Sequence, residues 1–179
     1  MNYFLTICFS LITYLGLCQD AIKTSGLFYK ISLGTTFTLN ENYMLFDEYD
    51  DTFIQPSAFL INNTLGYQFD ERSALGVNLE YDWHSQQGFQ FLPVHLSFKY
   101  NIIAKDDNLF VRGSYGRLIG INQNFRKGTL YKAGLGYQMF DANIKNSWLI
   151  GIDFSRKRFG IQQTEKLSSL SLFLEFMVF

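Results

Sequence analysis

The sequence alternates between apolar and polar side chains with a period of two over much of its length. In residues 75–83 every odd position holds Leu, Val, Tyr or Trp, whereas every even position holds Gly, Asn, Glu or Asp. Residues 92–102 repeat the pattern with the apolar side chains at the even positions. Successive side chains of a β-strand point to opposite faces, so each segment has one apolar face and one polar face. The pattern predicts an all-β chain whose apolar face meets either a protein core or lipid.

Eight segments of the sequence follow this pattern, and none shows a sustained helical period. We expect strands over about residues 26–39, 57–69, 75–83, 92–102, 109–116, 131–139, 148–155 and 170–178. Short polar turns at 70–73, 104–108 and 141–146 alternate with mostly longer connectors at 40–55, 85–90, 120–128 and 159–166. Short turns at one end and longer loops at the other are typical of bacterial outer-membrane barrels.

The volume of a small barrel decides which face points outward. The interior of an eight-stranded barrel is about as wide as its own side chains, so it cannot hold the apolar faces of all eight segments. No Lys or Arg lies mid-strand on the apolar face, where each would cost about 2–4 kcal/mol in lipid. We therefore predict an eight-stranded antiparallel up-and-down transmembrane β-barrel with a polar lumen.

The N-terminal segment differs in composition from the rest of the chain. Residues 3–18 contain no charged residue, which is typical of the apolar core of a secretory signal peptide. We expect residues 1–18 to be removed and residues 19–179 to form the barrel domain, with a membrane anchor or a buried strand as the alternative. Both cysteines, Cys8 and Cys18, lie in the segment that would be removed. The mature chain would then have no disulfide and no thiolate chemistry.

The signal segment, the eight amphipathic strands and the terminal Phe179 together resemble the small outer-membrane barrels of Gram-negative bacteria. The stretches FLPVHLSFKYNI and NLFVRGSYG look closest to the porin-like outer membrane β-barrel proteins of Bacteroidetes. This resemblance implies export through the periplasm, insertion by the barrel-assembly machinery, outer-membrane lipid and lipopolysaccharide as partners, a monomeric state, and no cofactor or metal. The formal net charge of −1 gives no reason to expect nucleic acid as a partner.

Charged side chains on the polar faces predict the content of the lumen. The candidates are Lys30, Glu80, Asp82, His95, Lys99, Arg112, Lys132, Asp153 and Glu175. Because buried charges persist only when they are paired, we expect a near-neutral ion-pair network that plugs the barrel. The first and last strands must pair to close the barrel, so Lys30 and Glu175 should lie close together.

Two further groups of residues belong to the ends of the barrel. Trp83 and Trp148 fall at opposite ends of their strands, as expected for the aromatic girdles of the two membrane interfaces. Six cations map to the long-connector end, where guanidinium groups could bind lipopolysaccharide phosphates or form an ordinary solvated rim. These cations are Arg117, Arg126, Lys127, Arg156, Lys157 and Arg158.

The function predicted from these features is that of a structural or surface-interaction barrel. The alternatives are a lipid-A-directed acyl hydrolase and a narrow passive channel. His84 and Ser85 invite the hydrolase reading, but adjacent strand residues point to opposite faces and do not meet the geometric test for a base and its nucleophile. The acidic residues within 47–51 lack the spacing of a calcium loop and read as a solvated tip.

Overall fold

The structure, a computed structural model, describes residues 25–39, 54–84, 88–104, 107–122, 124–142, 145–160 and 163–179. The predicted signal peptide (1–18) and the acidic residues within 47–51 lie outside these ranges. The strands are β1 (Gly26–Leu39), β2 (Ile54–Gln68), β3 (Ser73–His84), β4 (Phe89–Phe91), β5 (Pro93–Ala104), β6 (Asn108–Leu118), β7 (Gly128–Phe140), β8 (Asn146–Phe159) and β9 (Glu165–Val178). Only Leu92 separates β4 from β5, and both pair with β3. Together β4 and β5 act as one interrupted strand, so the nine labelled segments form an eight-stranded barrel.

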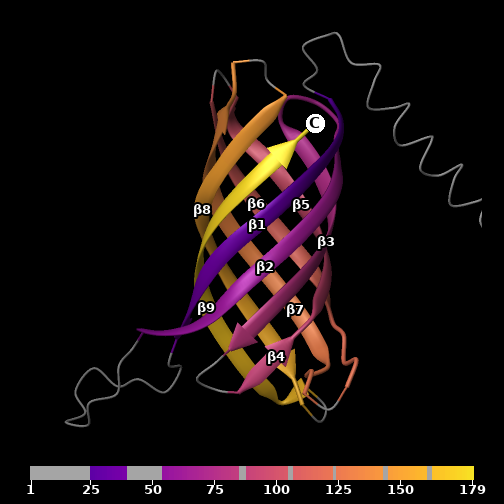
Figure 1. The fold of residues 1–179 in the computed structure, drawn as a ribbon, viewed down its shortest axis with the longest axis vertical. Helices are drawn as coiled ribbons and strands as arrows, with labels where there is room; N and C mark the ends of the chain where they lie inside the picture. Colours follow the sequence, from indigo (N-terminus) through magenta and orange to yellow (C-terminus); the bar gives the residue numbers. More distant parts are fainter. Residues whose placement is uncertain are drawn as a thin grey trace, which may run out of the picture.

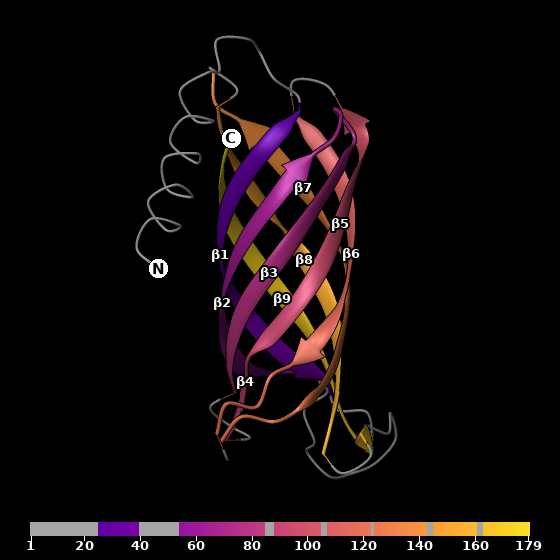
Figure 2. The same ribbon diagram turned by 90° about the vertical axis from the view of Figure 1, so that its right-hand side faces the viewer.

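The sheet closes on itself with up-and-down connectivity (Figures 1 and 2). Apart from the interruption between β4 and β5, each strand is antiparallel to the next one in the sequence, and β1 also pairs with β9. The β1–β9 register runs from Tyr29 opposite Val178 to Thr38 opposite Ser169. Closure gives nearly all the backbone N–H and C=O groups of the wall a partner, which a structure surrounded by lipid requires. Within the described ranges, no helix is long and apolar enough to cross a membrane.

The apolar residues of the alternating pattern face outward, as predicted. Leu79 is 50% exposed and Ile152 is 39% exposed, whereas the neighbouring Glu80 and Asp153 are 1% and 3% exposed. A water-soluble protein arranges these residue types the other way round. The outer wall is therefore a lipid-facing surface, and the charged side chains in the middle of the strands point into the lumen.

The aromatic side chains of the outer wall lie near both ends of the barrel. Trp148 lies near the start of β8, at the short-turn end, and packs against Phe176, with ring centroids 4.8 Å apart. Trp83 lies at the long-connector end of β3, opposite Phe59. Both tryptophans are about half exposed, which matches the amphipathic girdles of membrane barrels.

The strands extend further toward the long connectors than the alternation predicts. β8 continues to Phe159 and β9 begins at Glu165, although the sequence indicated strand ends near residues 155 and 170. Backbone pairing between them continues through Arg158 opposite Lys166. The alternation in the sequence ends before the strands do, because residues at the membrane interface are charged on both faces of a strand. Such residues hide the two-residue period of apolar side chains.

The short turns are held by local hydrogen bonds. The Asp70 carboxylate accepts hydrogen bonds from the backbone N–H groups of Arg72, at 2.7 Å, and Ser73, at 2.6 Å. These two bonds lower the pKa of Asp70, because they stabilise its charged form. The turn fixes the register in which β2 and β3 leave the membrane.

Candidate functional site: the filled lumen

The lumen contains a charged middle bracketed by two apolar clusters. At the short-turn end the cluster consists of Phe28, Ala74, Phe110, Leu149, Phe173 and Met177, with Phe179 packed against it. At the long-connector end it consists of Phe91, Leu118, Leu130, Phe159 and Leu167, with Phe89 packed against it. The alternating pattern predicted a polar lining at the inward positions and gave no sign of either cluster. Single Phe and Leu residues on a polar face give no periodic signal, although each lies at an inward position of its strand.

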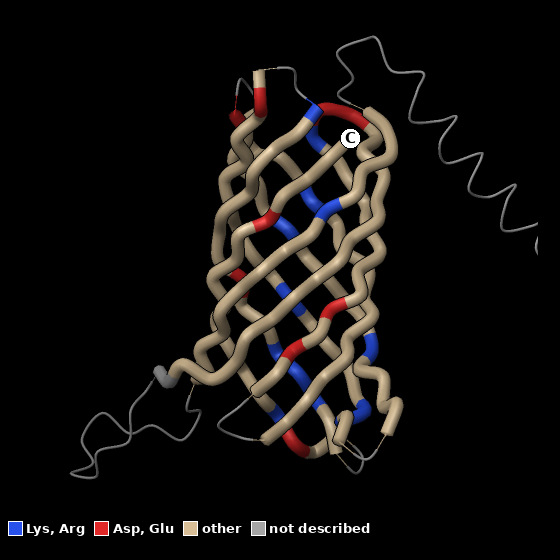
Figure 3. The backbone as a smooth tube through the Cα atoms, in the orientation of Figure 1, with Lys and Arg blue, Asp and Glu red and all other residues tan. Residues whose placement is uncertain are grey.

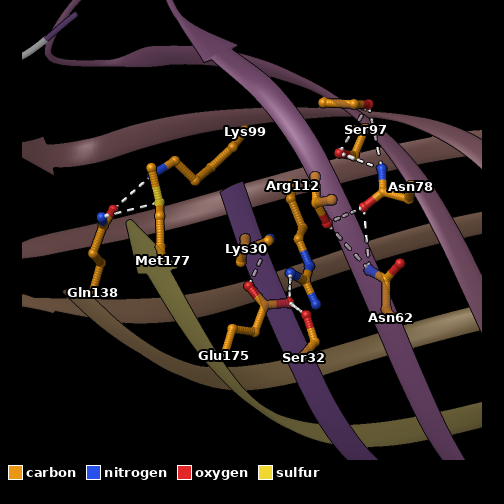
Figure 4. Close-up of polar contacts among 12 residues, drawn as sticks. Lys30, Ser32, Asn62, Asn78, Ser97, Lys99, Arg112, Gln138, Glu175 and Met177 are labelled. Carbon is orange, nitrogen blue, oxygen red and sulfur yellow. Dashed lines mark hydrogen bonds and ion pairs between the residues drawn. The ribbon is translucent and has the colours of Figure 1, made fainter. Parts of the chain in front are cut away.

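Arg112 organises the first group of charges. Its guanidinium group makes two hydrogen bonds to Asp153, from Nε to Oδ1 at 2.8 Å and from Nη2 to Oδ2 at 2.6 Å. Its Nη1 also donates to Glu175 Oε1 at 2.7 Å. Lys30 Nζ lies 2.6 Å from Glu175 Oε2, and Ser32 donates to Oε1 of the same carboxylate (Figure 4). Bidentate geometry of this kind gives strong charge-assisted hydrogen bonds.

A glycine makes the Arg112–Asp153 contact sterically feasible. In the sheet register Arg112 is opposite Gly134, and Gly134 is opposite Asp153. A Cβ atom at position 134 would lie 1.9 Å from Asp153 Oδ1. Gly134 therefore provides the space through which the carboxylate reaches the arginine two strands away.

The second group of charges lies nearer the long-connector end. Glu80 binds the ammonium group of Lys132, and His95 Nε2 lies 3.6 Å from Glu80 Oε2. Lys157 Nζ lies 2.7 Å from Asp82 Oδ2. In both pairs the ion partners come from opposite halves of the sequence and meet across the lumen.

The position of Lys157 corrects one prediction. We placed it among the cations of the outer rim, but it is 1% exposed and points into the lumen. Besides Asp82, its ammonium group lies 3.3 Å from His84 Nε2. Because β8 continues to Phe159, the alternation that turns Phe154 outward turns position 157 inward. Extending the two-residue period through the charged run would have revealed this.

The other five rim cations lie at the long-connector end of the barrel, where Figure 3 shows several basic positions. Arg117 and Arg158 are exposed on the outer wall, and Arg156 is half-buried there. Arg126 and Lys127 are exposed in the connector between β6 and β7. The Arg126 guanidinium carbon lies 5.2 Å from the centre of the Phe89 ring.

The geometry also bears on the chemistry that the lumen can perform. His84 is completely buried against Phe91, with ring centroids 5.4 Å apart, whereas Ser85 lies outside the described residues. Among the residues that the structure describes, no group of three or more His, Cys, Asp or Glu side chains is arranged to hold a metal ion. The arrangement of ion pairs and aromatic rings fills space and gives each of the four lumen carboxylates a cationic partner.

The Lys30–Glu175 contact can be tested by a double-mutant cycle on Lys30→Met and Glu175→Leu. We expect the double variant to lose less stability than the sum of the single variants, with a coupling of roughly 1–3 kcal/mol. Each single change leaves a charge in the lumen with one partner fewer. Unfolding titrations of detergent-folded protein measure the coupling, and additive losses would contradict the contact.

The closed sheet, the apolar outer wall and the charged interior define the class of the protein: it has the fold of the small eight-stranded β-barrels of the outer membrane. No protein-family model matches the sequence, and no curated protein matches it. The narrower resemblance to Bacteroidetes porin-like proteins therefore gains no support from these comparisons.

Two solved structures share the fold. The crystal structure of Neisserial surface protein A matches with a TM-score of 0.61 and 12% identity, covering 86% of this chain and 97% of that one. The N-terminal β-barrel domain of Pseudomonas aeruginosa OprF matches with a TM-score of 0.52 and 11% identity, covering 86% and 98%. At these identities the likeness establishes the fold alone.

Proposed function

We propose that this protein is a non-conducting structural or surface-interaction barrel rather than a channel or an enzyme. The observation that carries the proposal is the filled lumen, in which two apolar clusters enclose an ion-pair network. Two cavities inside it have volumes of only about 20 Å³ each, which is room for about one water molecule. An ion crossing this lumen would have to displace buried side chains and break buried ion pairs.

Planar-bilayer recording tests the closed lumen directly. We expect the refolded wild-type protein to show no steady conductance, because the apolar clusters block both ends. A variant carrying Phe91→Ala and Phe159→Ala, which removes two rings that contact each other at 5.1 Å, should conduct more than wild type. Steady conductance through the wild-type protein would favour the narrow channel instead.

The buried position of His84 supports a non-enzymatic role. Acyl-chain hydrolysis needs a base within hydrogen-bond reach of a nucleophile on the lipid side. His84 instead points into the lumen beside Lys157 and Phe91. We also propose that the protein is a monomer and that it is related to the porin-like barrels of Bacteroidetes.

We further propose that the outer wall of β6–β9 contacts lipopolysaccharide phosphates. Arg117, Thr129, Arg158 and Lys166 follow one another in a single pairing row across these four strands. Within the described part of the chain, Arg117, Arg158 and Lys166 form no ion pair with a carboxylate. Their charges are therefore available to an external anion.

The membrane depth of this row supports the same assignment. The next row toward the bilayer contains Tyr115 opposite Tyr131, with ring centroids 5.2 Å apart, and aromatic pairs of this kind mark the lipid headgroup level. The wall formed by β2 and β3 carries Phe59, Tyr81 and Trp83 near the same end. Among the described residues at this end, the Lys and Arg side chains thus lie on the β6–β9 side of the barrel, as expected for a docked headgroup and not for a uniform solvated rim.

A triple variant tests this contact. Changing Arg117, Arg158 and Lys166 to Gln should weaken binding to lipopolysaccharide vesicles by at least about tenfold, the equivalent of about 1.4 kcal/mol. The matched control changes Arg126 and Lys127 to Gln, which removes cations of the β6–β7 connector and should leave binding nearly unchanged. Equal loss in both variants, or in neither, would identify the row as an ordinary charged rim.

The final strand supports a proposal about assembly. Leu172, Leu174, Phe176 and Val178 form the outward row of β9, whereas Phe179 packs against the apolar cluster inside the lumen, 6.3 Å from the Phe28 ring. We therefore assign recognition by the barrel-assembly machinery to the outward row, and not to Phe179.

A further inference from the structure

The charges inside the lumen do not balance. Among the residues that the structure describes, five cations face inward, namely Lys30, Lys99, Arg112, Lys132 and Lys157, against the four carboxylates of Glu80, Asp82, Asp153 and Glu175. Every one of the four carboxylates has a cationic partner. The cation left without a carboxylate among the described residues is Lys99.

The groups in direct contact with the Lys99 ammonium are neutral. Its Nζ donates a hydrogen bond of 2.6 Å to Gln138 Oε1. The Gln138 amide is oriented for this contact because its Nε2 donates to Ser147 Oγ at 2.8 Å. An ammonium group has three N–H donors, so one neutral acceptor does not satisfy it. The Phe110 ring, with its centroid 5.5 Å from Nζ, adds a weak cation–π contact.

The sheet register places a second cation directly opposite the first. Lys99 of β5 pairs with Arg112 of β6, and like charges directly opposite each other in a sheet are destabilising. The guanidinium group of Arg112 is already bound to Asp153 and Glu175. A charge of opposite sign near Lys99 would relieve this repulsion.

A cavity lies at the place where such a charge would fit. Its volume is about 20 Å³, and its lining includes Lys30, Lys99, Arg112, Thr64 and Ser97 but no carboxylate. A second cavity of the same volume has Glu80, Asp153 and Glu175 in its wall as well as Lys30, Arg112 and Lys132. Of these two cavities, one has balanced charge and the other has charged side chains that are all cationic. A volume of this size suits a single particle about as large as a water molecule.

From this arrangement we infer that the cavity between Lys99, Lys30 and Arg112 is an occluded binding site for one small monovalent anion of chloride size. The anion accepts hydrogen bonds from the Lys99 ammonium group and neutralises the fifth lumen cation. It is part of the folded interior, held between the short-turn apolar cluster and the ion-pair network. The site goes beyond the structural and surface role proposed above and does not depend on lipopolysaccharide contact.

Halide linkage tests the site in the full-length, detergent-folded barrel. A ligand that binds only the folded state raises the folding equilibrium constant in proportion to its concentration once that exceeds Kd. With chloride replacing gluconate at constant ionic strength, we expect up to a tenfold rise per tenfold increase in chloride. Lys99→Gln should abolish the rise and Lys99→Arg should retain it. Lys145→Gln, which removes an exposed lysine of a short turn, serves as the matched control and should retain it. No chloride dependence in the wild type, or full dependence in Lys99→Gln, would overturn the inference.

Crystallography with bromide gives an answer that needs no variant. Crystals of the wild-type protein refolded in sodium bromide should show an anomalous peak between the side chains of Lys99, Lys30 and Arg112. An ordered water or an empty cavity at that position, with no anomalous signal, would overturn the assignment.

Discussion

Replacing Arg112 by Met is expected to destabilise the barrel by about 3–5 kcal/mol, the cost typical of removing one partner from a buried ion pair. The loss is large because both oxygens of Asp153 bind this one guanidinium group, and the Asp153 side chain is 4% exposed. Glu175 loses one bond but keeps those from Lys30 and Ser32. The measurement is the free energy of unfolding in detergent or lipid, obtained from urea titrations.

Two controls distinguish the cost of leaving Asp153 unpaired from a general loss of stability caused by substitution. The double variant Arg112→Met with Asp153→Leu should be more stable than Arg112→Met alone, because no uncompensated carboxylate then remains. Lys145→Met, at an exposed lysine of a short turn, should stay within about 0.5 kcal/mol of the wild type. A double variant that is less stable than the single one would show that the ion pair itself contributes net stability.

Replacing Leu79 by Arg should cost about 2–4 kcal/mol in a bilayer, the range for a cation at the membrane midplane. Leu79 lies in the middle of β3, paired with Asn63 and Val94, and its side chain points into lipid. Ile152→Arg should have a similar cost, because Ile152 occupies the corresponding outward position of β8. Refolding titrations into liposomes provide the free energies.

If lipid causes the destabilisation by Leu79→Arg, the cost of an introduced arginine should fall with its distance from the centre of the membrane. Ile121→Arg places the same charge in the connector between β6 and β7, where the side chain is 67% exposed, and it should cost about 0–1 kcal/mol. Leu79→Ala controls for the lost apolar contact without adding charge. Equal stability of Leu79→Arg and wild-type protein would mean that this wall does not face lipid.

The pattern of the sequence predicted the fold because the membrane imposes a local rule. Each strand must turn apolar side chains to lipid and polar ones to the lumen, so the period of two is visible segment by segment. The same rule would have extended β8 and β9, turning Lys157 inward and Lys166 outward. The period of two is no longer visible at the membrane interface, because water solvates charged side chains on both faces of a strand there. The two faces then no longer differ in polarity.

The membrane barrel, the outward face of each strand and the sign of the charges in the lumen were thus determined by the sequence alone. Only the tertiary structure decided which inward side chains meet, because closure and register set partners that lie far apart in the chain. Arg112 reaches Asp153 past Gly134, and Lys157 reaches Asp82 across the lumen. Within the described ranges, the same closure gives Lys99 an amide partner, Gln138, and no carboxylate in direct contact. A local period carries no information about these contacts, since it specifies the face of a strand and not the residue on the opposite wall.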